Sequence, residues 1–195
     1  MTEDIEHIRC ANKWFDHYFG IPDKSQNLAF KEDYEMLLRD IGTHIGAHNP
    51  NLEEFMKRGG KIISYSGAAD VSVPFGDMLK YYNRVCERLG GFEKVSEFFR
   101  HFTLPDKAHG NNGRGANACF GDDENQSLLD RLREWCVTGA APEHLTVARE
   151  IYEDGVKIGY GFIRQVYPYR ADMVEGKDFP KTTDDKFLDI PQRKD

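Results

Sequence analysis

The sequence predicts an α/β fold in which parallel strands are joined by a crossover helix and followed by a β-hairpin. An apolar, β-branched run at 61–66 ends in small residues, as a buried strand does. A helical apolar period over 75–89 separates it from a second β-branched and aromatic run at 94–105. Two further β-prone runs within 146–169 flank Asp154-Gly155, a dipeptide that tight hairpin turns favour. This order is typical of a parallel strand pair with a helical crossover and a C-terminal hairpin.

The segments before the first strand are less regular. Residues 1–50 mix aromatic and charged side chains, and only 31–46 has the apolar spacing of a helix, until glycines interrupt it. Residues 49–60 read as a short helix with Asn51 as its cap and a pair of glycines at its end. The first strand is therefore expected to start directly after a glycine stop.

Proline and glycine also mark the boundaries of the later elements. Pro74 precedes the crossover helix, and two glycines end it before the second strand. A polar, glycine-rich loop over 106–125 leads to a helix at 126–139, which also ends at a glycine. From Glu175 the chain is dominated by charged residues, so we expect a loose tail.

Composition excludes some classes of function. The chain has 195 residues, the size of one domain, and a net charge of −7 with no basic stripe, which argues against nucleic acid as a partner. No apolar run reaches the roughly 20 residues that span a bilayer, so no membrane segment is expected. The acidic start, MTEDIEHIRC, lacks the basic and then apolar pattern of an export signal.

The sequence gives little support for a metal site or for disulfides. The four cysteines contain no C-x-x-C pair, which favours reduced thiols over disulfides. His44 and His48 are spaced like two ligands on one helix face, but glycines break that helix and no third ligand is evident. The acidic cluster at 121–126 lacks the spacing of a calcium loop and is better explained as capping of the following helix. We therefore expect no metal and no cofactor.

Two polar residues follow the two predicted parallel strands. Asp70 comes after the first strand and His109 after the second, 39 positions later. Because the carboxyl ends of parallel strands meet at one sheet edge, the carboxylate can orient the imidazole and leave its other nitrogen to act as a base. Acid before histidine is also the chain order of an α/β-hydrolase triad. On pattern alone, Asp70 is equally compatible with a turn or helix cap, and His109 with an ordinary loop histidine.

Around these residues the sequence resembles the tannase and feruloyl esterase family of α/β-hydrolases. Three segments carry most of the resemblance: FMKRGGKIISYSGAADVSVPFGDMLKYYNRV, FFRHFTLPDKAHG and LLDRLREWCVTGAAPEHLTVARE. A fourth, RQVYPYRADMVEGKD, is similar to a proline-containing stretch near the family's C-terminus. The similarity runs in order from about Trp14 to about Asp178. It identifies the chain as the C-terminal part of an α/β-hydrolase fold.

The resemblance implies an organisation and a chemistry. Residues 1–50 would be a remnant of the family's lid, 51–145 the C-terminal half of the hydrolase core, 146–174 a hairpin with an extension, and 175–195 a charged tail. Asp70 and His109 match the acid and base of the family's serine triad, and the implied substrates are aromatic esters, hydroxycinnamoyl or galloyl. Some members bind calcium in the lid, but the segment present here shows no site for it.

The sequence departs from the family at three places. Gly110 stands where the family has a cysteine after its catalytic histidine, and Tyr167 replaces another cysteine. The resemblance therefore does not carry over the family's usual secreted or periplasmic setting. None of the six serines lies in a G-x-S-x-G elbow between a strand and a helix. In the family the nucleophilic serine lies far upstream of the acid and the base.

Two hypotheses remain open from the sequence. The chain is either the C-terminal portion of a carboxylic ester hydrolase, supplying the aspartate and histidine of a triad, or a non-catalytic remnant or interaction module with a hydrolase-like half-fold. Two parallel strands and a hairpin leave a sheet edge and much of a sheet face uncovered. We therefore expect a partner, either a missing N-terminal half or another copy of this chain.

Overall fold

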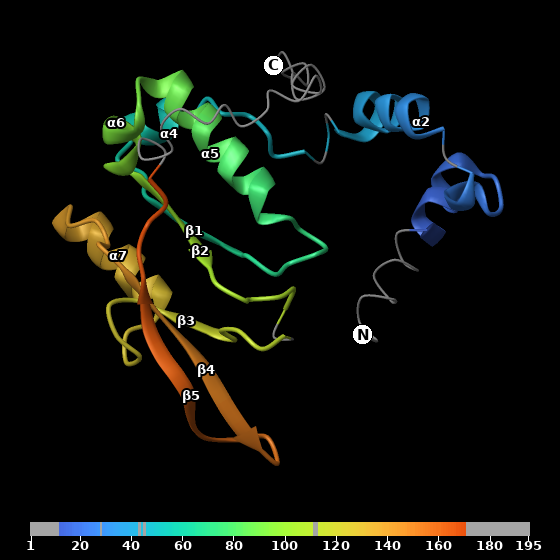
Figure 1. Cartoon of the computed structure of the whole chain (residues 1–195). Helices are drawn as coiled ribbons and strands as arrows, with labels where there is room; N and C mark the ends of the chain where they lie inside the picture. Colours follow the sequence, from blue (N-terminus) through green and yellow to red (C-terminus); the bar gives the residue numbers. More distant parts are fainter. Residues whose placement is uncertain (1–11, 28, 43, 45, 111–112, 171–195) are drawn as a thin grey trace. The chain divides into compact units, whose positions relative to one another are not determined.

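The computed structural model describes residues 12–27, 29–42, 44, 46–110 and 113–170. The described part of the chain divides into two units (Figure 1), one within residues 12–49 and the other within residues 50–170. The charged tail predicted from residue 175 lies outside the described part of the chain. Within that part no helix is long and apolar enough to cross a bilayer.

The first unit contains short helical segments. Residues 12–19 are helical and are followed by the 3₁₀ turn η1 (Lys24–Gln26), the α-helix α2 (Phe30–Leu37) and the π-turn η2 (Leu38–Gly42). The α-helical part of the segment predicted at 31–46 ends at Leu37. The chain continues as the π-turn η2 through Gly42, the first of the glycines expected to interrupt the helix. The rings of Trp14 and Tyr18 stack 5.5 Å apart, and the Tyr18 hydroxyl donates to Asp40 at 3.0 Å.

The second unit begins with the short helix α4 (Glu53–Lys57) and then forms the predicted parallel pair. The N-cap of α4 is Leu52, one residue later than the predicted cap, Asn51. The Asn51 side chain instead precedes the cap and accepts a hydrogen bond from the N–H of Glu53, the first residue of the helix. Strands β1 (Ile62–Gly67) and β2 (Phe99–Leu104) pair in parallel, with Ser64 opposite His101. The crossover between them contains α5 (Phe75–Leu89), which Figure 1 shows running alongside the pair, and the short helix α6 (Phe92–Ser96).

Helix α6 corrects the predicted second strand, which was expected over 94–105. Only its second half is extended, because the chain leaves α5 through two glycines at positive φ and turns into one more helical turn. Val95 of that turn is buried beneath α5. Tertiary packing thus overrides the local β propensity of this segment.

A second sheet is antiparallel and follows a loop. It contains β3 (Ala118–Phe120), β4 (Leu145–Glu153) and β5 (Val156–Val166) in that order. Helix α7 (Leu128–Thr138) separates β3 from β4, and the Ser127 hydroxyl caps it by accepting from the Asp130 N–H. The predicted hairpin turn is confirmed, with both Asp154 and Gly155 at positive φ. In Figure 1 the tip of this hairpin extends beyond the rest of its unit.

Strand β2 lies between two apolar layers. On one face Phe99 packs with buried residues of α5, and on the other Phe102 and Leu104 pack with Leu145, Val147 and other residues of the second sheet. The outer edge of β2 is covered as well, since Tyr169 N–H donates to the His101 carbonyl at 2.7 Å. A strand that is buried on both faces and on one edge is a rigid support for the loop that follows it.

Candidate active site

The ends of the two parallel strands bring Asp70 and His109 together, as the sequence predicted. His109 Nδ1 lies 3.0 Å from Asp70 Oδ2 and 3.2 Å from Asp70 Oδ1. Asp70 stands three residues beyond the end of β1, and His109 five residues beyond the end of β2. The two loops leave the same edge of the parallel pair, and this brings the carboxylate of Asp70 into contact with the imidazole of His109.

The carboxylate of Asp70 is held by its own turn. Its Oδ1 accepts from the backbone N–H groups of Ser72 and Val73, at 2.9 and 2.8 Å. Asp70 is thus a turn acid and a histidine partner at once, so the two alternatives raised by the sequence do not exclude each other. Burial raises the pKa of Asp70, but the hydrogen bonds from Val73, His109 and Ser72 outweigh it and the pKa is lowered.

The two side chains differ in their exposure to solvent. The Asp70 side chain is 13% exposed, whereas that of His109 is 40% exposed. A shielded carboxylate that accepts from Nδ1 fixes the ring tautomer and stabilises the imidazolium. The remaining nitrogen, Nε2, can then accept a proton from a nucleophile. This geometry is suited to general-base chemistry.

Lys107 links the two loops, and sequence reasoning missed it. Its backbone carbonyl accepts from the Ala69 N–H at 3.1 Å, next to Asp70. Its Nζ donates to the Gly110 carbonyl at 2.7 Å, just after His109. Burial lowers the pKa of Lys107, and the opposite effects of the nearby Cys119 and Asp70 are smaller, so its pKa is below the usual value. No motif marks a lysine for this role, which depends on how closely the loops approach.

Gly67 is required where the two loops meet. A Cβ at this position would overlap the backbone carbonyl of Lys107. The neighbouring atom is backbone and not the end of a flexible side chain, so the loop that carries His109 would have to move.

We expect Gly67→Ala to lower the free energy of unfolding by about 2 kcal/mol, because overpacking against a fixed backbone destabilises. Urea denaturation measures this change. Gly76→Ala is the matched control: it lies in α5 with nothing within 4 Å of the added Cβ, so it should stabilise by about 0.5 kcal/mol. Equal effects of the two substitutions would contradict the close approach.

Several serines of the second unit have identified structural roles. Ser64 and Ser66 bond the ring of His101, the Ser96 hydroxyl donates to the Glu93 carbonyl, and Ser127 caps α7. Ser72 contributes its backbone N–H to Asp70. These roles agree with the absence of a nucleophile elbow in the sequence.

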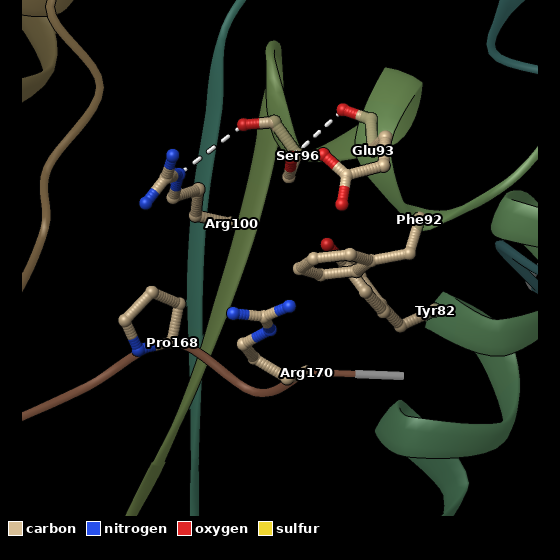
Figure 2. A pocket seen from close by; sticks show the side chains of 7 residues that line it. All are labelled: Tyr82, Phe92, Glu93, Ser96, Arg100, Pro168 and Arg170. Carbon is tan, nitrogen blue, oxygen red and sulfur yellow. Dashed lines mark hydrogen bonds between the residues drawn. The ribbon is translucent and has the colours of Figure 1, made fainter. Parts of the chain in front are cut away.

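A cavity of about 210 Å³ lies at the other end of β2, by its amino terminus. Figure 2 shows Arg100 donating to the Ser96 carbonyl on one side of it, and Arg170 beside the Phe92 ring on another. Seven residues line it: Tyr82, Phe92, Glu93, Ser96, Arg100, Pro168 and Arg170. The cavity is therefore separate from the Asp70–His109 pair, which follows the carboxyl ends of the strands.

Within the described ranges there is no group of three or more histidine, cysteine, aspartate or glutamate side chains that could hold a metal ion. Cys86, Cys119 and Cys136 are free thiols, and burial raises the pKa of Cys119 to about 11.

Comparison with known proteins identifies the family of this chain. The profile of the family described as tannase and feruloyl esterase matches residues 15–180. Feruloyl esterase C of Talaromyces stipitatus is 26% identical over 179 residues, covering 87% of this chain and 34% of that protein. Probable feruloyl esterase B-1 of Aspergillus terreus is 30% identical over 144 residues, covering 69% of this chain and 27% of that protein.

Solved structures agree with these relatives. An esterase from Aspergillus oryzae superimposes with a TM-score of 0.54 at 27% identity, covering 63% of this chain and 25% of that one. Tannin acyl hydrolase from Aspergillus niger gives the same TM-score, 0.54, at 19% identity over 71% of this chain and 25% of that one, a likeness of fold. The fold is thus part of an α/β-hydrolase, and the chain spans about a third of the length of the first relative. Since the family profile covers residues 15–180 of 195, the chain belongs to the tannase and feruloyl esterase family.

Proposed function

We propose that this chain supplies the acid and the base of a Ser-His-Asp site that hydrolyses carboxylic esters. The observation that carries the proposal is the 3.0 Å contact between Asp70 Oδ2 and His109 Nδ1 at the carboxyl edge of a parallel pair. The family to which the chain belongs, and the names of its relatives, support an esterase.

The two residues have different tasks in this mechanism. His109 Nε2 takes the proton of a serine hydroxyl as that oxygen attacks the ester carbonyl, and later returns it to the departing alcohol. Asp70 holds the imidazole in the correct tautomer and stabilises its protonated form. Water then attacks the acyl-enzyme, with His109 again as the base. Both residues stand beyond strand ends, on loops that Lys107 ties together.

The serine itself is proposed to lie on sequence outside these 195 residues. No G-x-S-x-G elbow is present in them, and about two thirds of the first relative's length has no counterpart here. The sequence encoded immediately upstream is the direct test, because it should contain such an elbow between a strand and a helix. Its absence would favour the second candidate, a non-catalytic module that retains the half-fold.

The proposed substrates are esters of aromatic acids, such as feruloyl or galloyl esters, as the names of the relatives suggest. We expect the isolated chain to leave methyl ferulate and methyl gallate unhydrolysed, because a general base without its nucleophile forms no acyl-enzyme. Chromatography of the released acid measures this. Turnover that a serine-directed fluorophosphonate abolishes would show that a nucleophile is present after all.

We further propose that the missing sequence pairs with the open edge of β1. Among the described residues β1 pairs only with β2, whereas the far edge of β2 is bonded by Tyr169. Alternate residues of a strand present their N–H and C=O to opposite edges. Since the backbone N–H groups of Ile62 and Ala68 donate to carbonyls of the β2 segment, the backbone N–H and C=O groups of Ile63 and Tyr65 face the open edge. Tyr65 is also 44% exposed, unlike side chains in covered parallel sheets.

In the absence of that sequence, we expect the isolated chain to self-associate through this edge, because an uncovered strand readily pairs with another. Size-exclusion chromatography with light scattering should give a mass above that of one chain, 22.4 kDa. Tyr65→Lys should shift the chain toward monomer, whereas Tyr152→Lys, an exposed tyrosine on the distant hairpin, should not. A well-folded monomer at high concentration would be inconsistent with an open edge.

A further inference from the structure

A buried histidine joins the two strands that lead to the candidate site. The His101 side chain is completely buried, with Nδ1 2.9 Å from Ser64 Oγ and Nε2 3.1 Å from Ser66 Oγ. His101 belongs to β2 and both serines to β1. Two side-chain hydrogen bonds therefore span the strand pair in addition to its backbone ladder.

This arrangement favours one register of the strands. Ser64 lies directly opposite His101, and Ser66 is the next residue of β1 on the same face. A slip by one residue would turn His101 or the serines to the opposite face and leave buried polar groups without partners. The bridge is thus satisfied only when β1 and β2 are paired as observed.

The burial of His101 favours its neutral form. The ring centre of Tyr82, from α5, lies 6.4 Å from that of His101. The backbone N–H of Tyr169 donates to the His101 carbonyl. Burial is the cause that lowers the pKa of His101 to about 4. A neutral imidazole has one donor and one acceptor nitrogen, which two hydroxyl groups satisfy completely.

We propose that the Ser64–His101–Ser66 bridge positions the candidate site by holding β1 in register with β2. Asp70 follows Ser66 by four residues and His109 follows His101 by eight. An offset between the strands is therefore passed on to the 3.0 Å contact between carboxylate and imidazole. The relevance of this role to catalysis rests on the proposed function, but the geometry itself can be tested without turnover.

The test measures the tautomer of His109 by nitrogen-15 NMR of the full chain at mildly alkaline pH. Asp70 selects the tautomer protonated at Nδ1. We expect Ser64→Ala and Ser66→Ala each to lower the ratio of this tautomer to the other about fivefold, the factor that corresponds to loss of one hydrogen bond of about 1 kcal/mol. Ser64 is only part-buried, so its replacement by alanine removes little packed volume, and the stability lost with its hydrogen bond is matched in a control variant.

Tyr82→Phe is the matched control. It removes another buried hydrogen bond to β2, from the Tyr82 hydroxyl to the Phe99 carbonyl, but does not connect β2 to β1. It should cost similar stability and leave the His109 tautomer unchanged. Unchanged tautomers in both serine variants, or an equal change in Tyr82→Phe, would overturn the proposal.

Conservative replacements of His101 provide a rescue experiment. His101→Asn places an amide near Nδ1 and can keep the bond to Ser64, whereas His101→Gln reaches the position of Nε2 and can keep the bond to Ser66. Both should retain more of the Nδ1 tautomer of His109 than His101→Ala, and equal losses in all three would contradict a bridging role. Failure of the esterase proposal would appear as absent hydrolysis in the complete protein and would not alter these ratios.

Discussion

Asp70→Asn should lower kcat by about 10⁴ in the protein that includes the nucleophile. Asp70 Oδ1 accepts both backbone N–H groups of the turn, so an asparagine would keep its oxygen there. Its amide NH₂ would then replace Oδ2 and point at His109 Nδ1. A donor at that place requires Nδ1 to accept and moves the ring proton to Nε2. The nitrogen that should take the serine proton would already be protonated.

Hydrolysis of methyl ferulate, with kcat and KM measured separately, checks this prediction. The loss should appear in kcat, because the substitution changes proton transfer and does not touch the bound ester. Asp77→Asn is the matched control, since Asp77 is exposed on α5 and its side chain pairs with Lys80, away from His109. A reduction of less than tenfold for Asp70→Asn would rule out Asp70 as the orienting acid.

The sequence predicted the pairing of Asp70 with His109 because a general rule of parallel sheets suffices for it. Residues that follow two adjacent parallel strands meet at one edge whatever their separation along the chain. The resemblance to the family then assigned the two roles. By contrast, Lys107 contributes through a backbone carbonyl and a lysine tip, and neither leaves a recognisable pattern in the sequence.

Other features depended on tertiary contacts. The short strand β3 lies inside a glycine-rich loop and is extended only because β4 pairs with it. Helix α6 contradicts local β propensity because Val95 gains burial there. The role of His101 depends on the register in which β1 and β2 pair. Hydrophobic patterns indicate which face of a strand is buried, but not which residues of the two strands lie opposite each other. Local patterns thus located the sheet edge that carries the candidate site but not the contacts that hold it in place.

Acidification from pH 6.5 to 4 should remove about 3 kcal/mol of the stability of the second unit through His101 alone. The pKa of this imidazole falls from an ordinary value of 6.5 to about 4 in the folded chain because burial disfavours its charged form. Between these pH values the unfolded chain binds a proton that the folded chain does not, so unfolding becomes easier as pH falls. The pKa of Asp70 is also lowered, but its contribution is lost only below its usual value of 3.8. The two groups therefore act in successive pH windows.

Urea denaturation at several pH values should show this dependence of stability on pH in the native chain. It should also show it in His144→Gln, which replaces a histidine that lies at the surface near Asp122. His101→Asn removes the titrating group and should flatten the slope between pH 6.5 and 4. A slope that persists in His101→Asn would assign the acid sensitivity to other groups.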